Sequence, residues 1–461
     1  MQRKLDAVVI GAGQSGPSLA VRLAESGQRV ALVERRGLGG TCVNDGCIPT
    51  KTLVASARAA WMARNAADWG VDIAGSVAVD MKRVKARKDA VVQHSRDSLA
   101  AWVKGTKNLE LVVGHARFES ARVVRIGDDL LEAERIFVNV GARATIPDLP
   151  GLTGGPFLTN SSMMDIDTLP EHLVILGGSY VALEFAQMYR RFGSRVTVIE
   201  RGGRLISRDD EDVAAEIKRV LEIEKVDVRL NTKALRVERA AGRVAVVTDA
   251  GRIEGSHLLL AVGRTPNTDD LDVDRAGIEL DARGYIRVDD ELRTSVPNVW
   301  ATGDCNGRGA FTHSSYNDYE IVASNLLDGD TRRVTDRIPI YGLYVDPPLG
   351  RVGMNEAQAR ASGRRVLVGK RPMTRVGRAR ERGETHGFIK VMVDADTKEI
   401  LGAAVLGIEG DEAVHAIADV MYARAPYTTI SRAVHMHPTV SELIPTTLQS
   451  LEPLAAAPGA P

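Results

Sequence analysis

Cysteine is scarce in this chain, which contains only three in 461 residues. A secreted protein held together by disulfides needs a much denser set of cysteines, so the count argues against a disulfide scaffold. It favours a reducing, cytoplasmic compartment, in which a cysteine pair has a chemical role and is not a structural disulfide.

A net charge and long apolar runs are also missing. The 60 lysine and arginine residues balance 60 aspartate and glutamate residues, so no overall field attracts nucleic acid or an anionic membrane. No apolar run approaches the roughly 18 residues of a membrane span, and Asp6 interrupts the apolar stretch near the start. We therefore expect neither a nucleic-acid partner nor a membrane partner. The length suits three or four domains.

Glycine, in contrast, is abundant, with 44 residues, and it marks two copies of one pattern. Residues 5–34 and 173–200 each predict a strand, a glycine turn, a helix and a second strand that ends in an acidic residue. The glycines let the backbone approach a pyrophosphate, the helix N-terminus attracts this anion, and the acid accepts hydrogen bonds from a ribose. The candidate dinucleotide-binding residues are Gly11, Gly13, Gly16 and Glu34 in the first copy and Gly177, Gly178 and Glu200 in the second. Tight turns without a ligand are the alternative, most of all in the second copy, where Ser179 replaces the middle glycine.

The remaining segments predict how the chain divides into domains. Gly141, Gly263 and Asp304 each follow a strand-like run, and alternating segments after about residue 338 predict an α+β domain. The predicted divisions are a first dinucleotide-binding domain in two parts (1–150 and 268–337), a second one (151–267), a C-terminal domain (338–450) and a disordered tail (451–461).

Two of the three cysteines, Cys42 and Cys47, lie in the segment GGTCVNDGCIPTK. An ideal helix would separate them by about 7.5 Å along its axis, too far for a disulfide, so we expect an irregular segment with Gly46 as its flexible point. Pro49 suits a first helical turn, which places Cys47 at the positive end of a helix and favours its thiolate. A redox pair, a metal clip and two inert thiols are the possible uses. No metal site is predicted, because Cys305 and the scattered histidines do not supply a second ligand pair at the usual spacing.

Together these motifs resemble the pyridine nucleotide-disulfide oxidoreductases. The resemblance is carried by the cysteine segment, both glycine patterns, AVGRTPN, ATGDC and HMHPTVSE. It implies an α/β fold with two Rossmann-like domains, the first for FAD and the second for NAD(P)H, and a C-terminal α+β dimerisation domain that makes a homodimer. FTHSSYNDYEIV and DPPLGRVGM resemble the branch with the reactive-chlorine resistance and mercuric reductases more than the lipoamide enzymes.

The resemblance also implies a role for single residues. The cysteines would form a redox disulfide, in which Cys47 lies against the flavin and Cys42 attacks the substrate. Lys51 and Glu184 would form an ion pair near the flavin, and Asp304 would bind its ribityl chain. His437 and Glu442 would form an acid-base dyad that reaches the cysteine of the partner subunit. Further cofactor contacts are implied at Thr41, Lys51, Ala116, Gly141, Val181 and Gly263.

The predicted reaction passes electrons from NAD(P)H through FAD to the cysteine pair and then to a small-molecule acceptor, a disulfide or a related compound. A metal-ion or oxidant-detoxifying reductase is one alternative, and a flavin-bound redox sensor without turnover is another. Glu200 would repel the 2′-phosphate of NADPH, whereas Arg201 and Arg204 would attract it. Arginines on a loop can turn to solvent at little cost, so the direct charge clash at Glu200 weighs more and NADH is favoured.

Three residues carry separate expectations. Asp45 departs from the apolar or neutral residue usual between the cysteines. It would raise the pKa of nearby thiols if it pointed inward, and would otherwise face solvent. Cys305 is expected to be a small packing residue, and His435 a structural one.

Overall fold

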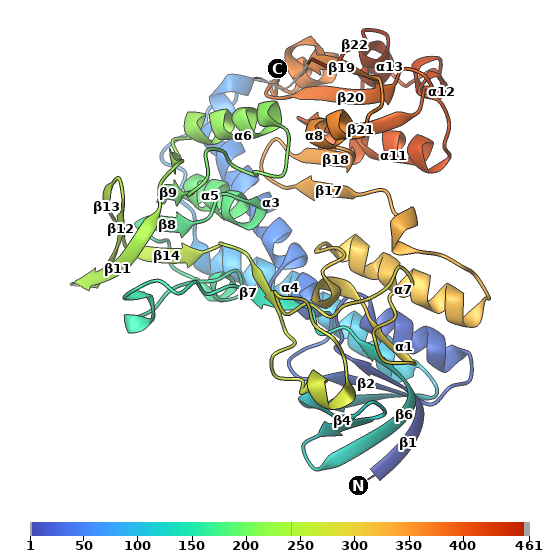
Figure 1. Cartoon of the computed structure of the whole chain (residues 1–461). Helices are drawn as coiled ribbons and strands as arrows, with labels where there is room; N and C mark the ends of the chain where they lie inside the picture. The colour runs from blue at the N-terminus through green and yellow to red at the C-terminus, as the bar shows by residue number, and fades with distance from the viewer. Residues whose placement is uncertain (1, 241, 456–461) are drawn as a thin grey trace.

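In the computed structural model, which describes residues 2–240 and 242–455, the chain forms three regions (Figure 1). The blue N-terminal segment and the yellow segment make the first region at the bottom of the view. The green segment makes the second, and the orange and red C-terminal segment makes the third at the top. The predicted α/β class, with two dinucleotide-binding folds and a C-terminal α+β domain, is confirmed.

The first region is built on the strands and helices β1 (Gln2–Ile10), α1 (Gly16–Glu25), β2 (Val30–Glu34), β3 (Leu109–Val113), β4 (Ala116–Ser120), β5 (Val123–Ile126), β6 (Asp129–Val138), β16 (Val299–Ala301) and α7 (Thr312–Leu327). The strand order is β3-β2-β1-β6-β5-β4, and β16 also pairs with β6. The strands β1, β2, β3, β6 and β16 run parallel, and β4, β5 and β6 form an antiparallel meander. The apolar end of β1, Ala7–Ile10, is fully buried, as expected for a central parallel strand. The pairing of β16 brings a late segment of the chain back to the first sheet.

Between β2 and β3 lie α2 (Gly40–Asn44), α3 (Cys47–Arg64) and the long helix α4 (Met81–Gly105). Asp80 caps α4 by accepting hydrogen bonds from the first backbone amides of the helix. α3 packs against α4 on one side and against a helix of the second region on the other. It therefore joins the two nucleotide-binding folds.

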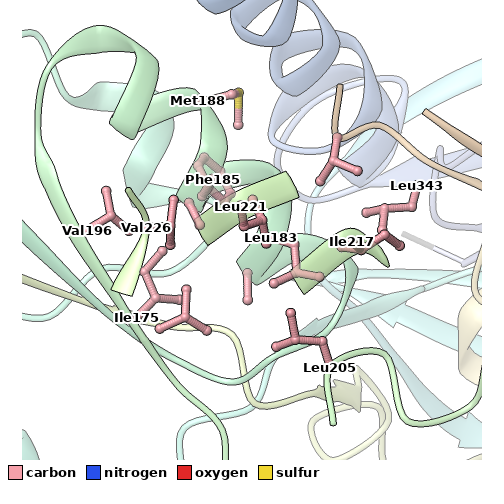
Figure 2. Packing of buried hydrophobic residues seen from close by; sticks show 14 of the residues in the cluster. Ile175, Leu183, Phe185, Met188, Val196, Leu205, Ile217, Leu221, Val226 and Leu343 are labelled. Atoms are coloured by element: carbon pink, nitrogen blue, oxygen red, sulfur yellow. The ribbon is translucent and has the colours of Figure 1, made fainter. Parts of the chain in front are cut away.

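The second region comprises β8 (His172–Leu176), α5 (Tyr180–Phe192), β9 (Arg195–Ile199), α6 (Glu211–Ile223), β10 (Asp227–Arg229), β11 (Ala234–Ala240), β12 (Arg243–Thr248), β13 (Gly251–Gly255) and β14 (His257–Leu260). Four strands form a parallel sheet in the order β10-β9-β8-β14, and β11, β12 and β13 form a separate antiparallel sheet. Figure 2 shows the core, in which Leu183 and Phe185 of α5 pack with Ile217 and Leu221 of α6 and with Ile175 of β8. The short strands β7 (Ala142–Ala144) and β15 (Arg264–Pro266) pair with each other where the chain enters and leaves this region.

The third region contains β17 (Ile340–Leu343), β18 (Leu349–Gly353), α8 (Glu356–Ala361), β19 (Val366–Pro372), α9 (Gly377–Glu381), β20 (Phe388–Asp394), β21 (Ile400–Leu406), α10 (Gly410–Ala413), α11 (His415–Tyr422), α12 (Thr428–Ser431), α13 (Leu443–Leu448) and β22 (Glu452–Pro453). The sheet order is β17-β18-β21-β20-β19-β22, and every residue of β20 and β21 is buried. The prediction of a disordered tail over residues 451–461 is wrong for its first residues, because β22 pairs with β19 and the sheet continues past residue 450. Residues 456–461 lie outside the described residues.

Two buried cations connect the second and third regions. The Arg351 guanidinium donates to Asp210 at 2.6 Å. The Lys390 ammonium lies 2.8 Å from Asp210, 2.6 Å from Asp212 and 2.6 Å from Glu356. Burial alone would raise the pKa of Asp210, but Arg351 and Lys390 lower it to about 2. This network fixes the start of α6 to the third sheet. Separately, none of the helices in the described parts of the chain has the length and apolarity to cross a membrane.

Candidate active site

The two cysteines lie on either side of a break between two helices. α2 ends at Asn44 and α3 begins at Cys47, so the segment between them is irregular, as the spacing predicted. Both cysteines are free thiols. Cys47 is at the first turn of α3, where the partial positive charge of the helix N-terminus favours a thiolate.

The surroundings of the pair shift the pKa values of the two thiols in opposite directions. A hydrogen bond from Cys42, helped by Thr312 and the Lys51 ammonium, lowers the pKa of Cys47 to about 6. The Thr312 hydroxyl lies 3.3 Å from Cys47 Sγ. The same hydrogen bond between the thiols, together with burial, raises the pKa of Cys42. At neutral pH the structure therefore places a thiolate at Cys47 and a thiol at Cys42.

Lys51 and Glu184 form an ion pair beside the cysteines. Lys51 Nζ donates to both carboxylate oxygens of Glu184, at 2.8 and 3.0 Å. Tyr344 completes the arrangement, because its backbone N–H donates to Glu184 at 3.1 Å and its ring centroid lies 4.5 Å from Lys51 Nζ. The pair links α3, which carries the cysteine, to α5 of the second region.

Asp45 neither faces solvent nor acts mainly on the thiols, so both expectations for it are corrected. Its residue is 8% exposed, and its carboxylate accepts a hydrogen bond from the Ser161 hydroxyl. The charged groups that act most on the pKa of Cys47 are Lys51 and Glu184. The Asp45 side chain points toward the neighbouring loop that carries Ser161, whose hydroxyl donates to it.

The first glycine turn forms a tight cradle. A Cβ atom at Gly11 would lie 2.3 Å from the Asn139 carbonyl oxygen, and one at Gly16 would lie 2.0 Å from the Gly11 carbonyl oxygen. The φ angle of Gly11 is +101°, which disfavours other residues. Asn139 holds the turn together, since Oδ1 accepts from Gly16 N at 3.1 Å. Nothing in the sequence pattern marked Asn139, although it directly precedes the Val140–Gly141 turn.

A cavity of about 330 Å³ opens at this cradle. Glu34 lies at its edge and accepts hydrogen bonds from Ala12 N and Arg36 N. Other predicted cofactor residues that line the cavity are Gly11, Gly13, Thr41 and Ala116. Because the backbone is bare of side chains at the helix N-terminus and an acid follows at the strand tip, these residues fit a dinucleotide such as FAD.

The second glycine turn is equally close-packed. A Cβ atom at Gly177 would lie 2.3 Å from the Ala261 carbonyl oxygen, and one at Gly178 would lie 2.9 Å from the Glu200 side chain. Glu200 accepts from Gly202 N at 2.7 Å. Val181, on the first turn of α5, is 37% exposed. These residues form a second turn that fits a nicotinamide dinucleotide.

The remaining residues predicted to contact a cofactor are Asp304, Gly141 and Gly263. Asp304 lies 3.3 Å from Arg264 Nε, and burial raises its pKa although Arg264 opposes the shift. Gly141 and Gly263 both have positive φ angles at the paired strands β7 and β15. Cys305 is fully buried, and burial raises its pKa to about 12, which agrees with a packing role.

The dyad residues meet in the third region. His437 Nδ1 lies 2.9 Å from Glu442 Oε2, and 77% of the His437 side chain is exposed. Arg378 of α9 donates to the Pro438 carbonyl oxygen from Nη2 at 2.7 Å and from Nε at 3.2 Å. His435, whose structural role stays a prediction, is partly buried, and its Nδ1 lies 3.3 Å from the Ala433 carbonyl oxygen.

Family models match most of the chain. The pyridine nucleotide-disulphide oxidoreductase model covers residues 5–318, and the dimerisation domain of the same family covers residues 340–448. The chain belongs to the pyridine nucleotide-disulfide oxidoreductase family. Members of this family carry FAD and use a nicotinamide dinucleotide, and the two glycine cradles fit these cofactors. The protein is therefore a flavoprotein oxidoreductase, as the sequence predicted.

Relatives within the pyridine nucleotide-disulfide oxidoreductases extend over almost the whole chain. A probable pyridine nucleotide-disulfide oxidoreductase, RclA, of Escherichia coli is 37% identical over 95% of this chain and 97% of that protein. A dihydrolipoyl dehydrogenase of Geobacillus stearothermophilus is 31% identical over 95% of this chain and 94% of its own length. A solved structure, described as the HOCl-induced flavoprotein disulfide reductase RclA from Escherichia coli, matches with a TM-score of 0.89 at 36% identity, covering 96% of this chain and 99% of the other.

Proposed function

We propose that the enzyme passes electrons from NADH through FAD to the Cys42/Cys47 pair and on to a small-molecule acceptor. The observation that carries this proposal is the hydrogen-bonded pair of Cys42 and Cys47, which lies beside Thr312 and beside the Lys51–Glu184 ion pair and lowers the pKa of Cys47. Bound FAD would take hydride equivalents from the nicotinamide and supply two electrons to the cysteine pair. Gly11, Gly13, Gly16, Glu34 and Asp304 would hold it.

The protein side chains divide the remaining work between them. Cys42, the protonated thiol, would attack the acceptor after losing its proton, and His437 would take up that proton while Glu442 holds its ring. Lys51, paired with Glu184, would keep a positive charge beside the reacting edge of the cofactor. The contact between His437 and Glu442 and the ion pair between Lys51 and Glu184 support these roles.

A homodimer follows from the position of the dyad. Among the described residues, no hydrogen bond joins His437 to either cysteine of the same chain, and the neighbouring Val434 and Met436 are 101% and 77% exposed. Exposed apolar side chains beside a catalytic histidine fit a surface that a second copy covers. The dimerisation domain of the family supports this arrangement. The scarcity of cysteine supports a cytoplasmic location.

Glu200 supports the preference for NADH. Its carboxylate lies at the end of β9 against Gly178, where a ribose would bind, and a 2′-phosphate there would meet a negative charge. Arg204 instead donates to the Ser207 carbonyl oxygen at 2.7 Å, so this arginine is engaged by its own loop.

Reduction of a metal ion is the second candidate for the outward step. A solved structure of RclA, 36% identical to this chain, is described as a Cu(II) complex, and so is a second structure, of an RclA mutant in which one cysteine is replaced by serine. A Cu(II) acceptor would receive electrons from the same cysteine pair, one per ion.

Steady oxidation of NADH tests the proposal. The purified holoenzyme is mixed with NADH or NADPH and with disulfides, Cu(II), Hg(II) or quinones as acceptors. We expect many turnovers with at least one acceptor and loss of turnover in Cys42→Ser. Oxidation of one equivalent of NADH followed by a halt with every acceptor would instead indicate a redox sensor.

A further inference from the structure

The segment between the two cysteines is tied to its surroundings from two directions. Asp45 accepts from the Ser161 hydroxyl through its carboxylate, and its backbone carbonyl accepts from Asn160 Nδ2 at 3.0 Å. The nearest cation, Arg36, lies 4.0 Å from the carboxylate. Asp45 therefore joins the cysteine segment to the loop that precedes the second region.

Asn44 ties the same segment to the other side. Its Nδ2 donates to the carbonyl oxygens of Leu38 and Gly40, at 3.0 and 2.7 Å, and its Oδ1 accepts from Arg96 Nε of α4. These contacts hold the end of α2. Asp45 holds the following residue, so the two neighbours act on different parts of the protein.

The position of this segment decides how the two sulfur atoms meet. Cys42 belongs to α2 and Cys47 to α3, and only Asp45 and Gly46 lie between the two helices. Gly46 cannot stiffen the connection with a side chain, because a Cβ atom there would lie 2.7 Å from the Thr41 carbonyl oxygen. The hydrogen bonds of Asn44 and Asp45 therefore hold the connection in place.

We propose that Asp45 is a positioning residue for the redox pair, acting through its hydrogen bond with Ser161 to keep Cys42 and Cys47 in place for disulfide formation. The inference rests on the proposed redox role of the pair. Disulfide formation from the Cys47 thiolate and the Cys42 thiol joins the two Sγ atoms, passes two electrons to the oxidant and releases the Cys42 proton, so it is favoured when both sulfur atoms are held close before reaction. Loosening the segment lowers their effective concentration and shifts the equilibrium toward the dithiol.

A purely electrostatic effect of Asp45 makes a different prediction. A carboxylate close to a thiolate would act through its charge, and removal of the charge would be enough to change the equilibrium. The Asp45 carboxylate is instead occupied by Ser161. Asp45→Asn removes the charge but keeps an oxygen that can accept the Ser161 hydrogen bond, whereas Asp45→Val removes both.

The experiment measures the thiol-disulfide equilibrium of the holoenzyme in glutathione buffers. Reduction of the Cys42–Cys47 bond consumes two glutathione thiols and yields one glutathione disulfide, and the two states are quantified by alkylation and mass spectrometry. The proteins compared are the parent enzyme, Asp45→Asn, Asp45→Val, Ser161→Ala and the double variant Asp45→Val/Ser161→Ala. FAD content and unfolding temperature are measured for each, because Asp45 and Ser161 also line the cavity at the first cradle.

We expect Asp45→Val and Ser161→Ala each to disfavour the disulfide by roughly tenfold, the effect of losing one hydrogen bond to a charged acceptor, which corresponds to a shift of about 30 mV. The double variant should show the same shift as either single variant, since both remove one interaction. Asp45→Asn should stay within roughly threefold of the parent.

Three results would overturn the inference: an unchanged equilibrium in Asp45→Val and Ser161→Ala, a full shift in Asp45→Asn, or two shifts that add in the double variant. If Asp45→Val fails to bind FAD, the thiol-disulfide equilibrium of Ser161→Ala is compared with that of the parent enzyme instead. A parent enzyme that forms no reversible disulfide between Cys42 and Cys47 would refute the proposed function instead, so the two failures are distinguishable.

Discussion

Arg378 binds the carbonyl oxygen of Pro438 through two of its nitrogen atoms, at 2.7 and 3.2 Å. Pro438 directly follows His437, so this arginine of α9 holds the loop that presents the imidazole. In Arg378→Ala we expect turnover with a disulfide acceptor to fall by roughly tenfold, the loss of about one charged hydrogen bond, with an unchanged KM for NADH. Steady-state kinetics check this.

Two matched variants sharpen that test. Arg378→Lys should recover part of the rate, because an ammonium can donate to the same carbonyl oxygen. Arg380→Ala, which removes an exposed arginine of the same helix, should behave like the parent enzyme. An equal loss in Arg380→Ala would mean that the charge of the helix matters and the contact with Pro438 does not.

Loss of the imidazole itself should be more severe. His437→Ala should slow turnover with disulfide acceptors by roughly 10²- to 10⁴-fold, the usual range for a general acid-base, while reduction of the flavin by NADH stays fast. Stopped-flow measurement of the two half-reactions separates these steps. His435→Ala, on the same exposed loop, is the control and should change neither. Normal turnover of His437→Ala with every disulfide would remove the dyad from the mechanism.

The charge state of Cys47 predicts a colour that depends on pH. After anaerobic reduction by two electrons, the holoenzyme should absorb at long wavelength, because the proposed mechanism places the Cys47 thiolate against the flavin. The band should fade as the pH is lowered through about 6, where Cys47 takes up its proton. Cys47→Ser should lack the band at every pH. A full-strength band in that variant would show that Cys47 is not the thiolate.

Cofactor choice should respond to Glu200. In the parent enzyme we expect a higher kcat/KM for NADH than for NADPH. Glu200→Ala should raise the ratio of NADPH to NADH use by roughly tenfold, because a direct clash of negative charges is removed. Preference of the parent enzyme for NADPH, or no change in Glu200→Ala, would mean that Arg201 and Arg204 dominate instead.

The buried cations predict a dependence of stability on pH. The pKa of Asp210 is lowered in the folded state from its usual 3.8 to about 2, so its contribution to stability is present above pH 3.8 and is lost as the pH falls toward 2. Thermal unfolding between pH 5 and about 2 measures this loss. Lys390→Met should destabilise the protein by about 3–5 kcal/mol near neutral pH, because it leaves buried carboxylates without a partner. The control is Lys370→Met, because the Lys370 side chain is 45% exposed. A loss of stability in Lys390→Met that is smaller than the loss in Lys370→Met would contradict the stabilising role of Lys390.

Local patterns in the sequence predicted the fold well, for a physical reason. The glycine turns, the strand before each and the acid after each are short-range features, and steric contacts such as that of Gly16 with Gly11 enforce them. Likewise, the break between Cys42 and Cys47 followed from the rise of a helix together with the short distance that a disulfide requires.

Contacts between distant segments could not be predicted in the same way. Asn139 supports the first turn from just beyond the end of β6, and Arg378 reaches Pro438 across the third region. Asp45 shows the limit most clearly, because its effect on a thiol depends on whether Ser161 occupies its carboxylate. β22 was missed because a two-residue strand has no periodicity and gains its stability only from pairing with β19.

The pairing of β16 with β6 has a consequence for the order of folding. On a growing chain, the first sheet cannot be completed until residue 301 has been made, and by then all of the second region has already emerged. The residues of the second region are therefore complete on the growing chain while the first sheet still lacks a strand and before Asp304, a proposed FAD contact, has been made. A site for FAD that includes Asp304 would be complete only late in synthesis. A chain interrupted before β16 would leave residues 136–138 of β6 as an unpaired edge.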